Sequence, residues 1–402
     1  MPETTAAPDL NAAWRDGTQA LREGRAQDAL RHLSQITAAG RGNAAAWTAM
    51  AVAYQMTGDR DAQKQALRQV LALDPRDLRA LIMTGDLHAD EGDDRAASSY
   101  YSAAARLAEV VRPADPGLKA EVARAAGLSA RYDAQYRDHL ARGMAAHAID
   151  RPEARRVRQS IDLLLGKQEI YLQQPRYFYF PELPQIAWAD RAAFPWLDKV
   201  EAATGAIRDD LLRVLEEDAK APTSAFSPYL QPEPNRPEFK PATGLLGDPS
   251  WSAFYLWKSG VPQPENLARC PSVAAALADA PLCTIPGRTP SVLFSLLRPG
   301  THIKPHHGFT NARFICHLPL IVPENCAMRV GPETRPWVEG EACVFDDSIE
   351  HEAWNRNADK LRVVMIFDIW RPELSAVERE LVSALLQVVD SYGSVAAPAW
   401  DA

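Results

Sequence analysis

The residues of this sequence best suited to chemistry are two histidines and an arginine, which stand in three separate strand-like runs. His306 lies in the segment THIKPHHG, His351 in FDDSIEHEAW and Arg362 in LRVVMIFDIW. A neutral imidazole is a good ligand for iron(II), and a planar guanidinium binds a carboxylate through two parallel hydrogen bonds. These three residues therefore predict a metal centre that also holds a dicarboxylate cosubstrate beside the metal.

The third protein ligand of such a centre is missing from its usual place. Nonhaem iron oxygenases commonly use two histidines and one carboxylate, and the carboxylate generally stands two residues after the first histidine. That position holds Gly308. The remaining ligand either comes from elsewhere in the chain or is replaced by water. His307 is the more plausible histidine for this place, although strand alternation points it away from the face of His306, and His302 is left unassigned.

The elements that must position these residues are short β-rich runs separated by proline and glycine, between residues 291 and 372. This pattern predicts a sandwich or a jelly-roll barrel, that is, a double-stranded β-helix of the cupin type. A helix should close the domain, because Ser375 and Glu378 have the spacing of a capping box. Residues 219–250 are proline-rich and without periodicity, which predicts a long surface loop that serves as a lid or a substrate wall.

The first hundred residues carry an internal repeat. Gly24, Gly58 and Gly92 are separated by 34 residues each, and each stands between two amphipathic stretches. A turn between two helices needs a residue that tolerates positive φ, which glycine does. The period resembles that of tetratricopeptide repeats. Stacked repeats leave a concave groove suited to peptides, or they serve as a helical spacer or a dimerisation surface.

These patterns predict an α+β multidomain chain in which helical repeats precede the jelly-roll domain. We expect a flexible N-terminus over residues 1–9, tetratricopeptide-like repeats over 10–110, and linking or capping helices over 111–168. The β domain with its C-terminal helix then occupies residues 169–402.

Composition narrows the class of protein. The chain has 402 residues, 47% of them hydrophobic, and a net charge of −8, which argues against a nucleic-acid partner. No run has the length of about 18 apolar residues that a membrane span needs, and the first residues lack the pattern of a secretory signal. The cysteines are five in number and contain no CxxC pair, which indicates reduced thiols. We therefore expect a cytoplasmic protein.

The second half of the chain resembles a known family. The segments FSLLRPGTHIKPHHG, NARFICHLPLIVP, FDDSIEHEAWN and LRVVMIFDIWRPEL are similar, in this order, to the aspartyl/asparaginyl β-hydroxylases, which are Fe(II)- and 2-oxoglutarate-dependent oxygenases. In that family two histidines hold the iron, and glycine stands where other oxygenases carry the carboxylate. The resemblance thus implies that His306 and His351 bind Fe(II), and that Asp347 hydrogen-bonds an iron-bound water as an outer carboxylate.

The resemblance also implies a site for 2-oxoglutarate. Arg362 would bind the far carboxylate of this cosubstrate, with Ser295 and His317 also in contact with it. The family often has an arginine two residues before the position of His317, where this sequence has Ile315. Arg313 lies two residues earlier on the same face of a strand, so it is a candidate contact for substrate or cosubstrate.

Two simpler interpretations remain for residues of this region. Arg362 would be a surface residue if its strand lay at the edge of a sheet. Asp346 would only cap the turn that follows its strand.

The implied activity is that of a dioxygenase that hydroxylates an unactivated carbon with O2. The family's substrate carbon is the β-carbon of aspartate or asparagine in a peptide or protein, which the repeats would help to hold. One alternative is a related hydroxylase of a lipid acyl chain or a small metabolite. Another is a noncatalytic scaffold in which the repeats bind peptides and the β domain has lost its activity.

Overall fold

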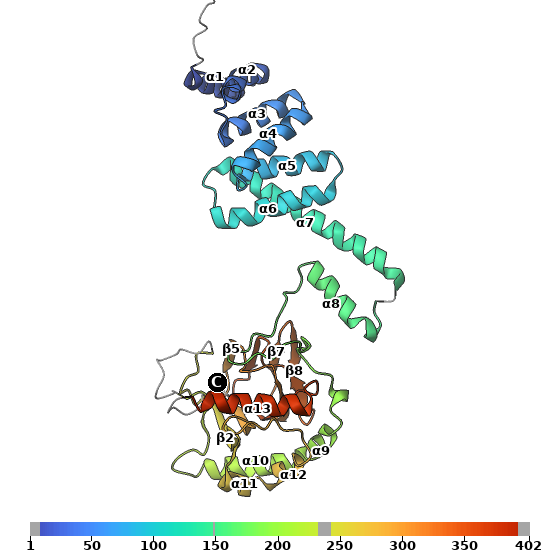
Figure 1. Cartoon of the computed structure of the whole chain (residues 1–402), viewed down its shortest axis with the longest axis vertical. Coiled ribbons are helices and arrows are strands. Elements are labelled where there is room, and N and C mark those ends of the chain that lie inside the picture. Colours follow the sequence, from blue (N-terminus) through green and yellow to red (C-terminus); the bar gives the residue numbers. More distant parts are fainter. Residues whose placement is uncertain (1–8, 148, 232–242, 393–402) are drawn as a thin grey trace, which may run out of the picture. The chain divides into compact units, whose positions relative to one another are not determined.

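The computed structural model describes residues 9–147, 149–231 and 243–392. Nearly all of the predicted flexible N-terminus and the central part of the predicted loop at 219–250 lie outside these described residues. The chain divides into two compact units, Met1–Lys167 and Gln168–Ala402 (Figure 1).

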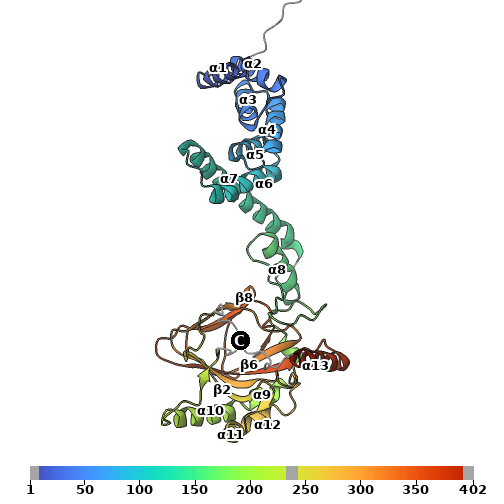
Figure 2. The same cartoon turned by 60° about the vertical axis from the view of Figure 1, so that its left-hand side comes forward.

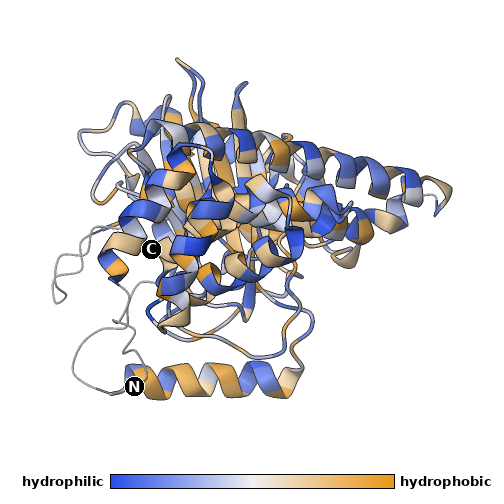
Figure 3. Ribbon diagram, turned by 90° about the horizontal axis from the view of Figure 1, so that it is seen from above, coloured by the Kyte–Doolittle hydropathy of each residue, from blue (hydrophilic) through white to orange (hydrophobic). Residues whose placement is uncertain are grey.

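The first unit begins with three helical hairpins. In each hairpin two consecutive helices pack against each other. The helices are α1 (Leu10–Arg22), α2 (Ala26–Ala38), α3 (Ala44–Thr57), α4 (Arg60–Leu73), α5 (Leu78–Asp90) and α6 (Asp94–Val111). Figure 3 shows that hydrophobic and hydrophilic residues are interspersed along the helices of the chain. The glycines at the three hairpin turns, Gly24, Gly58 and Gly92, have φ of 77°, 77° and 76°, which confirms the predicted turns.

A long helix closes the stack of hairpins. Helix α7 (Pro116–Met144) packs against α5 and α6. Asp86 of α5 accepts hydrogen bonds from the hydroxyl of Tyr101 at 2.6 Å and from Arg124 of α7 at 2.7 and 2.8 Å. The unit then continues through the short 3-10 helices η1 (Ala145–His147) and η2 (Pro152–Ala154) to α8 (Arg155–Leu164).

The second unit is built on two sheets in which every strand pair is antiparallel. The large sheet has the order β1-β2-β4-β11-β6-β9, with β3 beside β2, and the small sheet has the order β5-β10-β7-β8. The strands of the large sheet are β1 (Ser227–Pro228), β2 (Trp251–Lys258), β3 (Val261–Pro262), β4 (Val292–Leu297), β6 (Arg313–Ile321), β9 (Cys343–Phe345) and β11 (Arg362–Trp370). Those of the small sheet are β5 (His302–His306), β7 (Cys326–Val330), β8 (Glu333–Pro336) and β10 (His351–Asn355). Helical repeats followed by an antiparallel β domain confirm the predicted fold class.

Helices cover the outer face of the large sheet (Figure 2). They are α9 (Leu197–Ala202), α10 (Thr204–Asp218), α11 (Pro264–Arg269) and α12 (Pro271–Ala276), and the short 3-10 helix η3 (Arg191–Ala193) precedes α9 in the chain. One hydrophobic core joins α9, α10 and α12 to the sheet. Helices α11 and α12 are separate short helices and not one continuous helix, because Pro271 starts a new helix directly after Cys270. The last helix, α13 (Ala376–Asp390), begins with the predicted capping box of Ser375 and Glu378.

The central strands of the large sheet are buried on both faces, and their side chains alternate between two environments. On β11, Val363, Met365, Phe367 and Ile369 belong to the core beneath the helices. Arg362, Ile366 and Asp368 point to the opposite side, where they line a cavity. This alternation presents polar side chains of a central strand to the space between the two sheets.

None of the described helices is long and apolar enough to cross a membrane. All five cysteines are free thiols, and four of them are buried.

Candidate active site

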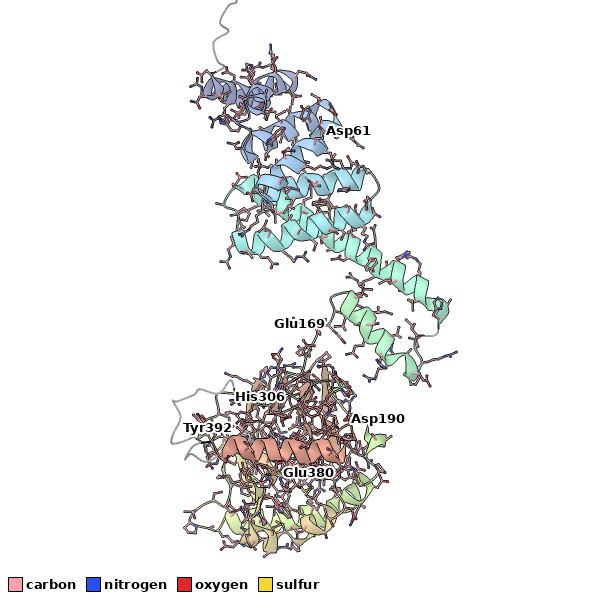
Figure 4. The ribbon with its side chains drawn as sticks, in the orientation of Figure 1. Asp61, Glu169, Asp190, His306, Glu380 and Tyr392 are labelled. Atoms are coloured by element: carbon pink, nitrogen blue, oxygen red, sulfur yellow. The ribbon has the colours of Figure 1, made fainter. Side chains whose placement is uncertain are left out.

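The two predicted ligand histidines lie opposite each other on neighbouring strands. Strands β5 and β10 pair in a register that sets His306 directly across from His351. Their ring centroids are 4.1 Å apart and the ring planes meet at 50°. The pairing of two antiparallel strands thus brings together residues separated by 45 positions in the sequence. Figure 4 labels His306 among the side chains of the second unit.

Each histidine has one ring nitrogen in a hydrogen bond and one left for other chemistry. The Nδ1 atom of His306 is 2.8 Å from the carbonyl oxygen of Lys304, and that of His351 is 3.1 Å from the carbonyl oxygen of Ile349. A carbonyl oxygen only accepts, so Nδ1 carries the proton and Nε2 keeps its lone pair. Burial lowers the pKa of His306 to about 4. Burial and the neighbouring His306 hold the pKa of His351 well below its usual value. Both imidazoles are therefore neutral near pH 7.

A cavity of about 260 Å³ lies between the two sheets and includes both histidines. Its walls come from β4, β6 and β11 of the large sheet and from β5, β7 and β10 of the small one. The structure brings all the predicted site residues to this cavity: Ser295, His306, Arg313, His317, Asp347, His351 and Arg362.

The described residues do not group a third metal ligand of the expected kind with the two histidines. His307 lines the same cavity as His306, so the prediction that it points away was wrong. Strand β5 ends at His306, and alternation does not continue past the end of a strand. Within residues 9–147, 149–231 and 243–392, no three His, Cys, Asp or Glu side chains are grouped to hold a metal ion. His302 instead pairs with Glu352 at 2.7 Å and does not line the cavity.

The carboxylate of Asp347 fills the space that a side chain at position 308 would occupy. A Cβ atom on Gly308 would lie 2.0 Å from Oδ2 and 2.2 Å from Cγ of Asp347. The glycine amide donates a hydrogen bond of 2.6 Å to the main-chain oxygen of Asp347. A carboxylate therefore reaches this place from the turn before His351 and not from position 308.

This arrangement fits an Fe(II) ion held by two imidazoles. The Oδ1 atom of Asp347 is buried and has no hydrogen-bond partner among the described residues, so it could accept a hydrogen bond from a water on such an ion. Burial raises the pKa of this carboxyl to about 7, against the opposing effect of Arg313. Two neutral imidazoles and an adjacent carboxylate oxygen are the donor types that Fe(II) accepts.

Asp346, the neighbour of Asp347, anchors the turn. Its Oδ1 accepts the amide of Ser348 at 3.0 Å, which is the capping role that one interpretation gave it. Its Oδ2 accepts hydrogen bonds of 2.7 Å from Arg371 and from Gln173. Because Asp346 and Arg371 are fully buried, this ion pair fixes the turn that carries Asp347.

Arg362 also lines the cavity and is a buried cation without a carboxylate partner in the described part of the chain. Its strand lies between β4 and β6, so the edge-strand interpretation was wrong. The side chain is 2% exposed, and it forms no ion pair with a carboxylate of the described residues. Burial lowers the pKa of this guanidinium to about 10. A buried charge without a counter-charge is costly, which indicates that an anion completes this part of the site.

The groups around Arg362 are also arranged for an anion. Its Nη1 donates to the main-chain oxygen of Ser295 at 3.2 Å and approaches Oγ at 3.4 Å, while its Nε has no partner among the described residues. The Oγ of Ser295 also accepts a hydrogen bond of 3.1 Å from Nε1 of Trp251, which leaves the hydroxyl proton free to donate. Burial, with a smaller contribution from Arg362, lowers the pKa of His317 to about 3, so this ring is neutral.

Arg313 lies between two carboxylates near the histidines. It forms ion pairs with Asp368 and, at 3.2 Å, with Asp347. Asp368 and Trp251 are cavity residues that the sequence reasoning missed. Asp368 could have been predicted from the sequence, because strand alternation places residue 368 on the same face as Arg362. Trp251 could not have been predicted from the sequence, because its contact with Ser295 depends on the register between β2 and β4.

Two parts of the chain are similar to known protein families. Residues 201–372 match the family profile described as Aspartyl/Asparaginyl beta-hydroxylase, and residues 20–81 match that of the Tetratricopeptide repeat. The chain is 29% identical to the Aspartyl/asparaginyl beta-hydroxylase of Mus musculus over 339 residues, which cover 84% of this chain and 40% of the relative.

Two further relatives match a smaller part of the chain. It is 37% identical to the Ornithine lipid ester-linked acyl 2-hydroxylase of Rhizobium tropici over 187 residues, which cover 46% of this chain and 60% of the relative. It is 31% identical to the Aspartate beta-hydroxylase domain-containing protein 2 of Xenopus tropicalis over 218 residues, which cover 53% of this chain and 55% of the relative. The matched regions thus span 40% to 60% of the length of these relatives. Residues 201–372 are thus similar to the aspartyl/asparaginyl β-hydroxylase family, and tetratricopeptide repeats precede them in the first unit.

Proposed function

We propose that this protein is an Fe(II)- and 2-oxoglutarate-dependent dioxygenase that hydroxylates an unactivated carbon. The observation that carries the proposal is a cavity with two facing neutral imidazoles and a buried guanidinium that forms no ion pair with any described carboxylate. The first feature fits a metal ion, and the second fits the carboxylate of a cosubstrate. Bound Fe(II) would supply the activation of O2, with 2-oxoglutarate converted to succinate and CO2 as the substrate gains one oxygen.

The residues of the chain would have three roles in this reaction. His306 and His351 would offer their Nε2 atoms to the metal, since a carbonyl oxygen already binds each Nδ1. Asp347 would accept a hydrogen bond at Oδ1 from a water on the metal. Arg362 and Ser295 would bind the far carboxylate of 2-oxoglutarate through guanidinium and hydroxyl donors.

We propose the β-carbon of aspartate or asparagine in a peptide or protein as the substrate carbon. The family of the second unit and the tetratricopeptide repeats of the first support this choice. Repeats of this kind form a surface suited to extended peptides. The repeats would bind the polypeptide whose residue enters the cavity.

An acyl chain is the second candidate substrate, and one feature of the cavity favours it. Much of the cavity wall is apolar: Leu293, Ile303, Ile315, Met328, Phe345, Ala353 and Ile366. Ile315 stands where the family often has an arginine, and Arg313 is already paired with two carboxylates. A relative named for acyl 2-hydroxylation matches 46% of the chain.

The reaction itself provides the test. Purified protein with Fe(II), O2 and 2-oxoglutarate should release succinate, and either a peptide or a lipid from cell extract should gain one oxygen by mass spectrometry. His306→Ala and His351→Ala should abolish both signals. His302→Ala is the matched control, because His302 belongs to the same strand but pairs with Glu352 away from the cavity. Wild-type turnover by the His306→Ala or His351→Ala protein would refute the proposal.

A further inference from the structure

A line of buried polar groups crosses the large sheet and ends at Asp347. The amide of Ser291, just before β4, donates a hydrogen bond of 2.6 Å to Oδ2 of Asp368 on β11. Oδ1 of Asp368 accepts from Nη1 of Arg313 on the neighbouring β6. Nη2 of Arg313 then donates to Oδ2 of Asp347 at 3.2 Å. All four residues line the cavity and none is more than 6% exposed.

Asp368 determines how Arg313 meets Asp347. A guanidinium beside a carboxylate tends to bind both of its oxygens through two parallel hydrogen bonds. Here one terminal nitrogen of Arg313 is bound to Asp368, and the other donates to Oδ2 of Asp347 and not to Oδ1. The second oxygen of Asp347, Oδ1, has no partner among the described residues. A bidentate pair would have occupied that oxygen.

Charge also opposes a cosubstrate role for Arg313. If its guanidinium turned to a carboxylate of 2-oxoglutarate, Asp347 and Asp368 would be left as buried anions without their counter-charge. Leaving a buried carboxylate without its partner is strongly unfavourable. Arg362 lines the same cavity and forms no ion pair with a carboxylate within the described ranges, so it is a better receptor for that anion than Arg313.

We propose that Arg313, itself held by Asp368, is a positioning residue that keeps Oδ1 of Asp347 free for a water on the metal, and that it does not bind 2-oxoglutarate. This inference rests on the proposed function, because it assigns the free oxygen to a metal-bound water. The Asp368–Arg313 pair acts through Asp347 and touches neither metal nor cosubstrate.

The test is the affinity of the full-length protein for Co(II), measured by titration calorimetry without turnover. Asp368→Asn should weaken Co(II) binding about 10- to 100-fold, the usual effect of losing an outer partner of a metal site. The reason is that Arg313 becomes free to engage both oxygens of Asp347. Arg313→Gln should have a similar effect, because it releases Asp347, and it serves as the second variant if Asp368→Asn does not fold.

A double-mutant cycle separates positioning from a general loss of structure. In the Asp347→Asn background, Asp368→Asn and Arg313→Gln should cause no further loss of Co(II) affinity, because the group through which they act is gone. Asp390→Asn is the matched control. It removes the carboxylate partner of another buried arginine, Arg288, outside the cavity, and should leave Co(II) affinity unchanged.

Any of three results would overturn the inference. The first is a Co(II) affinity within twofold of wild type for both Asp368→Asn and Arg313→Gln. The second is a loss of affinity in each variant that simply adds to the loss caused by Asp347→Asn. The third is an Arg313→Gln protein that binds Co(II) normally but has a raised KM for 2-oxoglutarate, which would make Arg313 a cosubstrate contact. A wild-type protein that does not bind Co(II) at all would instead refute the proposed function.

Discussion

Replacing Gly308 by alanine should disturb the site more than its single added carbon suggests. The backbone of Gly308 is not in the left-handed region, so an alanine has no conformational penalty there. The conflict is one of space, because the new Cβ would lie 2.0 Å from Oδ2 of Asp347, whereas ordinary contacts begin near 3.4 Å. The carboxylate would have to retreat by about 1.4 Å, the difference between these two distances.

The magnitude follows from what holds the carboxylate in place. A retreat of this size would break the hydrogen bond of 3.2 Å from Arg313 to Asp347, and a hydrogen bond between charged groups contributes about 1.5–3 kcal/mol. Forcing an extra carbon into a packed site costs a further 1–3 kcal/mol, roughly. Replacing glycine by alanine returns about 0.4–1 kcal/mol through the unfolded chain. We therefore expect Gly308→Ala to lower the free energy of unfolding by about 2–5 kcal/mol.

Urea unfolding and Co(II) titration measure the two consequences. The second variant is Gly308→Ala with Asp347→Ala, which removes all three atoms of Asp347 that the new Cβ would meet. It should regain stability relative to Gly308→Ala alone but should not regain Co(II) affinity. A Gly308→Ala protein with wild-type stability and wild-type Co(II) affinity would show that Asp347 does not occupy the space beside position 308.

Three further predictions concern the rest of the cavity. Arg362→Gln should raise the KM for 2-oxoglutarate at least tenfold, since charged hydrogen bonds contribute about 1.5–3 kcal/mol each. The same change should not lower the stability of the ligand-free protein in urea unfolding, because it removes an uncompensated buried charge. Trp251→Phe should raise that KM about 2- to 10-fold in steady-state assays, because Ser295 loses a hydrogen bond that contributes about 0.5–1.5 kcal/mol. The pKa of His317 is lowered to about 3 in the folded protein, so its unfolded form binds the proton first and stability falls as the pH drops below about 6.5. Between pH 7.5 and pH 5, wild-type protein should therefore lose about 2 kcal/mol more unfolding free energy than His317→Gln.

The sequence predicted those features that depend on local periodicity. The spacing of Gly24, Gly58 and Gly92 predicted the three hairpin turns, because a helix-helix turn requires the positive φ that these glycines adopt. Strand alternation from Arg313 placed His317 on the same face, and both side chains do line the cavity. The same rule failed for His307, since it holds only within a strand and β5 ends one residue earlier.

Features that depend on pairing between distant segments were out of reach of the sequence. The spacing of 45 residues between His306 and His351 says nothing about register, yet a shift of one residue between β5 and β10 would turn one of the two rings to the opposite face. The contact between Gly308 and Asp347 is even harder to predict from the sequence. It depends on where a turn outside the strands places the carboxylate of Asp347. The buried ion pair of Asp346 and Arg371 fixes that turn.

The two carboxylates of this turn illustrate why residue type alone does not assign a role. Asp346 and Asp347 are adjacent and both are buried, but they differ in how many of their carboxylate oxygens accept hydrogen bonds. Both oxygens of Asp346 accept hydrogen bonds from Ser348, Gln173 and Arg371, so this carboxylate has no capacity left for a ligand. Asp347 is contacted at Oδ2 and retains a buried oxygen, Oδ1, without a partner among the described residues. A buried acceptor without a donor is unfavourable unless a ligand completes it, and for this reason Asp347, and not its neighbour, is the carboxylate that would serve the proposed metal.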